Sequence, residues 1–160
     1  MTIETLDERK QVFTEALAVL KQQAMFDDEK ALLTHALSDV RVRDALLKSF
    51  TDSELEKSGD TSPVTVAIAI DTLRHRFGDN EADYPVNVLA TLAGLSAIDS
   101  EPEESIRYAK LGLAHTDYQL GKSLCALLMR AFTYIDHSKA CEIFTESIDA
   151  LTLEDTLQGA

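Results

Sequence analysis

The sequence predicts an all-α protein, and three observations support this prediction. Apolar residues recur three and four positions apart through most of the 160 residues, which is the spacing of one face of an α-helix. Only 3 prolines and 6 glycines interrupt the chain, so long helices can form. Hydrophobic residues make up 45% of the chain but aromatic residues only 6%, which indicates a core of closely packed Leu, Ala, Ile and Val.

Two predicted helix pairs in residues 85–151 recur at an offset of 35 residues. This offset is close to the ~34 residues of a tetratricopeptide-type unit, in which two antiparallel helices form a hairpin. The sequence therefore predicts antiparallel helical hairpins in a tetratricopeptide-like, right-handed helical array of about seven or eight helices. The matching positions are Leu89, Leu92, Ala93, Ser96, Ser105, Ala109 and Gly112 in the first pair, and Leu124, Leu127, Leu128, Ala131, Ala140, Phe144 and Ser147 in the second.

The first two helices have recognisable starts. Thr5-x-x-Glu8 has the form of a capping box, so the first helix is predicted to begin at Thr5. Asp27 and Asp28 interrupt the apolar pattern and place carboxylates where the dipole of a new helix favours them. A second, short helix is therefore predicted directly after them.

The next two helices are predicted from capping residues. Ser38 is expected to cap a third helix over residues 39–50. A further capping box, Thr51-x-x-Glu54, predicts a separate brief helix after it.

Residues 64–70 are rich in β-branched side chains, which is typical of a strand. Helix is nevertheless the prediction, because apolar residues from Val66 to Phe77 recur at helical spacing and no partner strand is evident. The loop that follows, residues 78–83, is the only plausible subdomain boundary.

The remaining helices are predicted to begin at a proline or at a polar capping residue. Proline suits this position because it lacks the N–H group that the first helical turn leaves unpaired. Gly112 is expected where two helix axes approach closely. The predicted starts are Pro85, Pro102 (with Ser100 as cap), Thr116 and Ser138.

A single helical domain is predicted over residues 1–151, because a chain of 160 residues can bury one hydrophobic core without help from disulfides or metal ions. Residues 1–77 would hold the N-terminal helices and residues 85–151 the two tetratricopeptide-like hairpins. Residues 152–160 are expected to form a frayed tail.

The charge of the chain is strongly negative, at −13 with a pI near 4.6. Such a field repels phosphate groups, so the sequence argues against nucleic acid and anionic membranes as partners. The N-terminus lacks the basic and apolar regions of a signal peptide. Cys125 and Cys141 lie on apolar helical faces and are expected to be reduced core thiols, so a cytoplasmic location is predicted.

Residues 35–47 contain a pattern close to "L-x-D-x-R-V-R-D-A-L", and residues 89–99, 105–113 and 117–121 follow it as further helical segments. These four segments resemble the signature and the later helices of a large actinobacterial family of unknown function. The similarity extends roughly from Ala31 to Met129 and covers only the C-terminal helical half of the family. This chain departs from the family by lacking its tryptophan and its Gly-Asp turn. The resemblance implies a tetratricopeptide-like fold and no known activity.

The predicted binding surface is a groove on the inner helices of the hairpins, open to a protein or peptide partner. A second candidate site is an anion clamp of Arg41 and Arg43, which lie near a helix start. Structural ion pairs with acidic neighbours are the alternative for these two arginines. The residues expected to line the groove are Leu89, Ser96, Leu120, Leu124 and Ala131.

No catalytic or metal-binding motif is evident in the sequence. The four histidines are isolated, without the spacings of zinc sites, and no G-x-S-x-G nucleophile motif occurs. We therefore expect neither a cofactor nor a metal, and no enzymatic activity.

The leading functional hypothesis is a non-catalytic protein–protein interaction module, for which homo-oligomers are also conceivable. One alternative is an acidic inhibitor or immunity-type partner of a basic protein, driven by the charge of −13. The other is a small-anion-binding regulator that uses Arg41 and Arg43.

Overall fold

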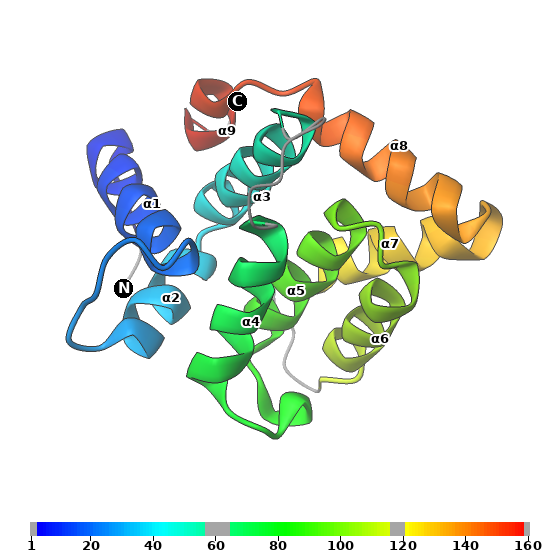
Figure 1. Ribbon diagram of the computed structural model, residues 1–160, viewed down its shortest axis with the longest axis horizontal. Helices are drawn as coiled ribbons and strands as arrows, with labels where there is room; N and C mark the ends of the chain where they lie inside the picture. Colours follow the sequence, from blue (N-terminus) through cyan, green and yellow to red (C-terminus); the bar gives the residue numbers. More distant parts are fainter. Residues whose placement is uncertain (1–2, 57–64, 116–120, 159–160) are drawn as a thin grey trace.

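The computed structural model describes residues 3–56, 65–115 and 121–158, and every regular element in these ranges is helical (Figure 1). The all-α prediction is therefore confirmed for this part of the chain. None of the helices in these ranges is both long and apolar enough to span a lipid bilayer. The α-helices, nine in the described ranges, are α1 (Leu6–Leu20), α2 (Glu29–Leu37), α3 (Val40–Glu56), α4 (Thr65–Phe77), α5 (Val86–Ile98), α6 (Pro102–Leu113), α7 (Gly121–Tyr134), α8 (His137–Asp149) and α9 (Leu153–Gln158), with one 3₁₀ turn at Glu81–Asp83.

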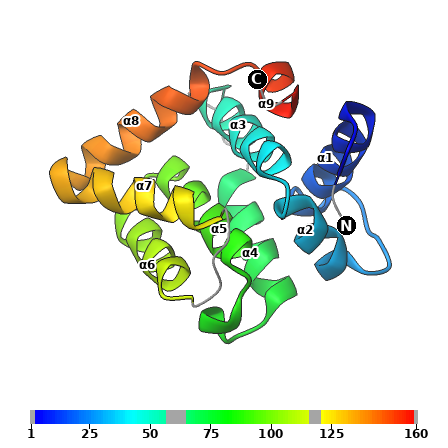
Figure 2. The same cartoon turned by 180° about the vertical axis from the view of Figure 1, so that it is seen from behind.

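Helix α5 lies at the centre of the molecule, with other helices around it (Figures 1 and 2). It contacts α2, α3, α4, α6, α7 and α8, and all of its residues except Asn87 are buried. A helix that is apolar on all sides belongs in a protein interior, because no face of it gains from contact with water. The core around α5 takes residues from both halves of the chain, from Ile3 to Leu157.

Helices α5 and α6 form a closely packed hairpin. The buried hydroxyl of Ser105 on α6 donates a 2.7 Å hydrogen bond to the carbonyl of Ala93 on α5. Gly112 makes its tightest approach to α7 instead, since a Cβ at this position would lie 2.6 Å from Sγ of Cys125 and 3.7 Å from Cβ of Leu89. The absence of a side chain at Gly112 therefore sets the spacing between α6 and α7.

Helices α7 and α8 form a more open pair. They meet near their connecting turn and diverge from it, as both views show (Figures 1 and 2). The far part of α8 contacts α3, which comes from the N-terminal half. The two predicted hairpins therefore do not pack alike, because small residues close the first while larger apolar side chains face the gap in the second.

Two predictions about helix ends were wrong. Residues 152–160 were expected to fray, but Leu153–Gln158 form α9, whose Leu157 is buried. The carbonyl of Leu157 accepts a 2.7 Å hydrogen bond from Nε of Arg9 on α1, which fixes this short helix to the core. Thr51 does not start a new helix, because its hydroxyl bonds the carbonyl of Leu47 within a continuous α3.

Two predicted helix starts are confirmed, and each carries a capping side chain. The Thr5 hydroxyl accepts a hydrogen bond of 3.1 Å from the Glu8 amide at the start of α1. A carboxylate oxygen of Asp28 accepts a 3.0 Å bond from the Ala31 amide at the start of α2. These caps satisfy amides that the first turn of a helix leaves without an internal partner.

Two other predicted caps lie at neighbouring residues. Asp39 caps α3 by accepting a 2.8 Å bond from the Arg41 amide, while Ser38 ends α2. Asp136 caps α8 by accepting bonds from the amides of Ser138 and Lys139. In both places an aspartate takes the role, since its charge adds to the attraction of the helix dipole.

Hydrogen bonds hold the connection between α4 and α5 against the end of α4 and against α6. Tyr84 is buried, and its hydroxyl donates to the carbonyls of Gly78 and Arg74 at the end of α4. Glu81 accepts a 2.9 Å hydrogen bond from Nη1 of Arg107 on α6. Burial alone would raise the pKa of Glu81, but the hydrogen bond from Arg107 and the nearby positive charges outweigh it and lower the pKa.

Replacing Gly112 with alanine is expected to destabilise the protein, because the added methyl group would meet Sγ of Cys125 at 2.6 Å. Overpacking lowers the free energy of unfolding by about 1–3 kcal/mol. Alanine is a better helix former than glycine, and this offsets at most about 1 kcal/mol of the loss. Urea denaturation of the wild type and of Gly112→Ala measures the difference.

The matched control is Cys125→Ala, which removes the sulfur atom that the new methyl group would meet. In that background, Gly112→Ala should lower the free energy of unfolding much less than it does in the wild type. Equal losses in the two backgrounds would contradict the contact between α6 and α7 described above.

Candidate functional site

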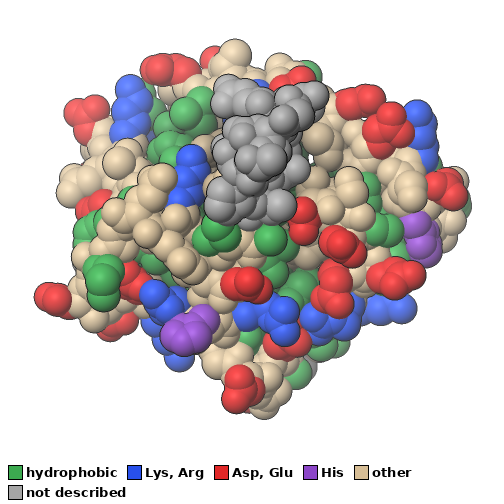
Figure 3. Space-filling view, in the orientation of Figure 1, with side chains coloured by type: hydrophobic (Ala, Val, Ile, Leu, Met, Phe, Trp, Pro, Cys, Tyr) green, Lys and Arg blue, Asp and Glu red, His purple; other side chains and the backbone are tan. Residues whose placement is uncertain are grey.

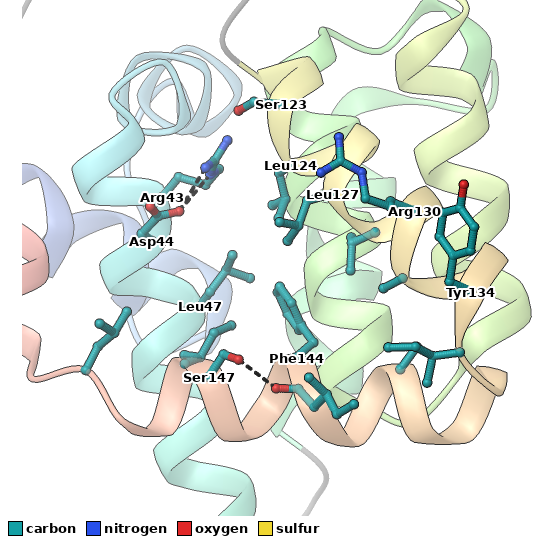
Figure 4. A pocket seen from close by; sticks show the side chains of 17 residues that line it. Arg43, Asp44, Leu47, Ser123, Leu124, Leu127, Arg130, Tyr134, Phe144 and Ser147 are labelled. Carbon is teal, nitrogen blue, oxygen red and sulfur yellow. Dashed lines mark hydrogen bonds and ion pairs between the residues drawn. The ribbon is translucent and has the colours of Figure 1, made fainter.

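A groove of ≈ 730 Å³ lies between α3, α7 and α8 (Figure 4). Leu47 of α3, Leu124 of α7 and Phe144 of α8 approach one another from its three sides. Gly94 of α5 lies behind two of them, since a Cβ there would be 3.0 Å from Leu47 and 3.6 Å from Leu124. The groove is lined by Arg43, Asp44, Leu47, Ser123, Leu124, Leu127, Leu128, Arg130, Ala131, Tyr134, Ile135, Ala140, Ile143, Phe144, Ser147, Ile148 and Leu151.

Large apolar side chains along the groove are open to solvent. Leu127 is 53% exposed and Tyr134 81% exposed, both on α7. Ile143 of α8 is 37% exposed and Leu151, just beyond α8, is 47% exposed. Scattered apolar residues are common on protein surfaces, but four along one concavity make a continuous apolar surface, which is typical of an interaction site.

The structure places the predicted groove residues in two different environments. Leu124 and Ala131 on α7 line the groove between α3, α7 and α8, which differs from the predicted groove on the inner helices of the hairpins. Leu89 and Ser96 do not, because both are buried inside the core on α5, at 0% and 1% exposure. That part of the prediction was wrong, since it treated α5 as a helix with one open face. Leu120 lies outside the described residues.

Arg43 is the polar feature at one end of the groove (Figure 4). Its Nε and Nη2 donate hydrogen bonds of 3.0 and 2.9 Å to the same oxygen, Oδ1 of Asp44. The third nitrogen, Nη1, is buried and has no hydrogen-bond partner anywhere in the described chain. Arg43 as a whole is only 4% exposed.

Arg41 does not join Arg43 in an anion clamp, and that prediction was wrong. Residues two apart on a helix do not face each other, and Arg41 is not among the residues that line the groove. Its Nε and Nη2 each lie 3.4 Å from a carboxylate oxygen of Asp39. The ion pairs that formed the alternative interpretation are present, but both join close neighbours in sequence rather than separate helices.

The second cation of the groove is Arg130 of α7, which the sequence interpretation did not single out. It is exposed, and within the described residues it takes part in no hydrogen bond or ion pair. With Arg43 and Asp44, it gives the described lining a net charge of +1, in a chain whose net charge is −13. The face seen in Figure 3 instead mixes acidic and basic side chains over its surface.

The thiols near this site are not activated. Burial raises the pKa of the Cys125 thiol to about 11, although the nearby charge of Arg43 partly opposes the shift. Burial and the charge of Glu101 also raise the pKa of Cys141. Both thiols are therefore protonated at neutral pH and poor nucleophiles. In the described part of the chain, no group of three or more His, Cys, Asp or Glu residues is placed to hold a metal ion.

Comparisons with protein-family models, with curated proteins and with solved structures found no match. The resemblance of residues 35–47 to the actinobacterial family therefore stays a prediction from the sequence. Any functional proposal rests on the groove and on the residues that line it.

Replacing Arg43 with methionine is expected either to raise the free energy of unfolding or to lower it by less than about 1 kcal/mol. Methionine removes the unsatisfied buried Nη1 and leaves Asp44, which is 40% exposed, free to be hydrated. Thermal and urea denaturation measure the effect.

Lys48 provides the control, because it is another buried cation on α3 but is fully engaged. Its Nζ lies 2.8 Å from Oδ1 of Asp52 and 3.0 Å from the carbonyl of Asp149. Lys48→Met should lower the free energy of unfolding by roughly 1–3 kcal/mol. A loss of the same size in Arg43→Met would show that Arg43 serves the fold rather than the groove.

Proposed function

We propose that the protein is a non-catalytic binding module whose α3–α7–α8 groove holds an apolar helical segment of a partner protein. The observation that supports this most directly is the set of exposed apolar side chains along the groove, Leu127 and Tyr134 above all. Leaving them in water is unfavourable, at about 25 cal/mol per Å² of apolar surface, and a bound segment removes that surface from water.

The form of the groove favours a helix as its occupant. Its walls are themselves helices, and an amphipathic helix binds such a surface by placing its apolar side chains between theirs. The volume of ≈ 730 Å³ is within the range of about 300–1,000 Å³ that is common for binding sites. The described C-terminal residues do not occupy the groove, because α9 packs on α1 and α3.

The chemistry of the lining supports binding rather than catalysis. Among the described residues of the groove there is no histidine, cysteine or glutamate. Ser123 and Ser147 therefore have no histidine in the described lining that could activate them, and the carboxylate of Asp44 accepts hydrogen bonds from Arg43.

Two further parts of the sequence interpretation belong to this proposal. The first is that residues 85–151 form a tetratricopeptide-like array. In this proposal its binding face lies on α7 and α8, because α5 is enclosed by other helices. A cytoplasmic location is consistent with free thiols at Cys125 and Cys141, both buried.

Selection of random peptides displayed on phage against the purified protein tests the proposal. Peptides that bind the groove should bind Leu127→Glu at least about tenfold more weakly, because the new carboxylate would be buried against their apolar face. Fluorescence anisotropy with synthetic copies of the selected peptides gives the affinities.

Met25→Glu is the matched control, because Met25 is 93% exposed in the connection between α1 and α2, outside the groove. It should leave the affinities unchanged. Recovery of only those peptides that bind Leu127→Glu as tightly as the wild type, or of no binding peptide at all, would overturn the proposal. Binding of basic peptides that is lost with added salt would instead favour the acidic-inhibitor alternative.

A further inference from the structure

The exposed residues of α7 form one stripe along the groove. Leu127 and Tyr134 are two helical turns apart and share one face of α7, about 10 Å from each other along its axis. Arg130 lies between them in the sequence, is also exposed and also lines the groove. A partner segment that covers both Leu127 and Tyr134 therefore lies beside Arg130.

The guanidinium of Arg130 is accessible to such a segment. Long side chains on a helix extend back toward its N-terminus, and Figure 4 shows Arg130 extending in this direction, toward the turn that carries Leu127. Its N–H groups are not used within the described chain, where Arg130 takes part in no hydrogen bond or ion pair. Arg43 differs on both points, because it is buried and bonds to Asp44.

A bound segment would remove water from around Arg130. A charged group that loses water without gaining a partner is unfavourable, so a segment that fits the groove well supplies an acceptor here. A carboxylate matches a guanidinium best, since its two oxygens can accept two parallel hydrogen bonds. A basic side chain at this position would instead be repelled, although the chain as a whole would attract it.

The charges of the groove agree with a single carboxylate. Asp44 offsets the charge of Arg43, with which it forms an ion pair. The charge of Arg130 is the one that stays without compensation in the described lining. One acidic residue on the partner would balance it.

The spacing on α7 fixes where that acidic residue lies in the partner. Two helices that pack side by side rise by the same distance per residue, so contacts two turns apart on α7 are two turns apart on the partner as well. A side chain one turn from either contact, three or four positions away, lies on the same face of the partner helix. The acidic residue therefore falls between two apolar residues that are seven positions apart.

We infer that the segment bound in the groove is an amphipathic helix in which an aspartate or glutamate lies between two apolar residues seven positions apart, and that its carboxylate pairs with Arg130. This inference rests on the proposed function and specifies the partner's chemistry. The apolar residues cover Leu127 and Tyr134, and the ion pair sets the register of the partner helix along α7.

The test uses the peptides selected in the experiment above. Groove-dependent peptides, defined by their loss of affinity for Leu127→Glu, should share an acidic residue between apolar positions seven apart. For the tightest of them, changing that Glu to Gln or that Asp to Asn should weaken binding to the wild type about 3- to 10-fold. This factor is modest because an ion pair at the edge of a groove stays partly in contact with water.

A double-mutant cycle assigns the effect to Arg130. Arg130→Met keeps a long apolar side chain but removes the charge, so it should weaken binding of the acidic peptide by a similar factor and hardly affect the neutral peptide. Lys110→Met is the matched control, since Lys110 is exposed on α6, does not line the groove and contributes the same charge. It should change both affinities by less than about twofold. Melting curves of both variants establish that they are folded.

The outcomes separate the two claims. Groove-dependent peptides without a shared acidic residue, or a cycle without coupling between Arg130 and the acid, would overturn the carboxylate inference and leave the proposed function in place. Coupling of the acid to Lys110 as strong as to Arg130 would show a general effect of net charge and would overturn the inference too. Absence of any groove-dependent peptide would overturn both claims.

Discussion

The burial of α5 on all sides is the constraint on which the rest of the structure depends. A helix with only Asn87 outside the core is stable when other helices surround it, and six of them do so. Small residues then fix the neighbours: Ser105 brings α6 onto α5, and Gly112 lets α6 lie against Cys125 of α7. Helix α8 extends from the end of α7 to α3, so α7 and α8 cannot close on each other. The groove is the space that this arrangement leaves between them.

The two buried cations of α3 show how the groove differs from the rest of the fold. Lys48 is surrounded by acceptors from Asp52 and Asp149 and joins α3 to the end of α8. Arg43 has one partner, the adjacent Asp44, and keeps a buried nitrogen without one in the described structure. Tyr108 and His115 also carry a buried polar atom without a partner in the described structure, but of the three only Arg43 lines the groove. Arg43 and the exposed Leu127 therefore point to the same surface.

The helices could be predicted from the sequence because their signals are local. The segment from Val66 to Phe77 shows this, since its helical spacing, together with the lack of a partner strand in the sequence, correctly outweighed its β-branched composition. The uniformly apolar pattern of α5 also indicated burial on all sides, and would have excluded Leu89 and Ser96 from a groove. Helix α9 has a local signal that the prediction did not use, Thr152-x-x-Asp155, in which the Thr152 hydroxyl accepts a hydrogen bond from the Asp155 amide. A helix of six residues also depends on tertiary contacts such as the bond from Arg9 to the Leu157 carbonyl, and those do not follow from the local sequence.

The site was predictable only in part. Helix α7 has apolar residues on more than one face, so some of them had to remain exposed, but the partner helices that form the groove with α7 follow from tertiary packing. Native-state hydrogen exchange tests the central claim most directly. The amides of α5 should exchange slowest, with an opening free energy equal to that of global unfolding. Exchange of α5 amides through a smaller opening than those of α3 or α6 would contradict the central position of α5 and the origin of the groove.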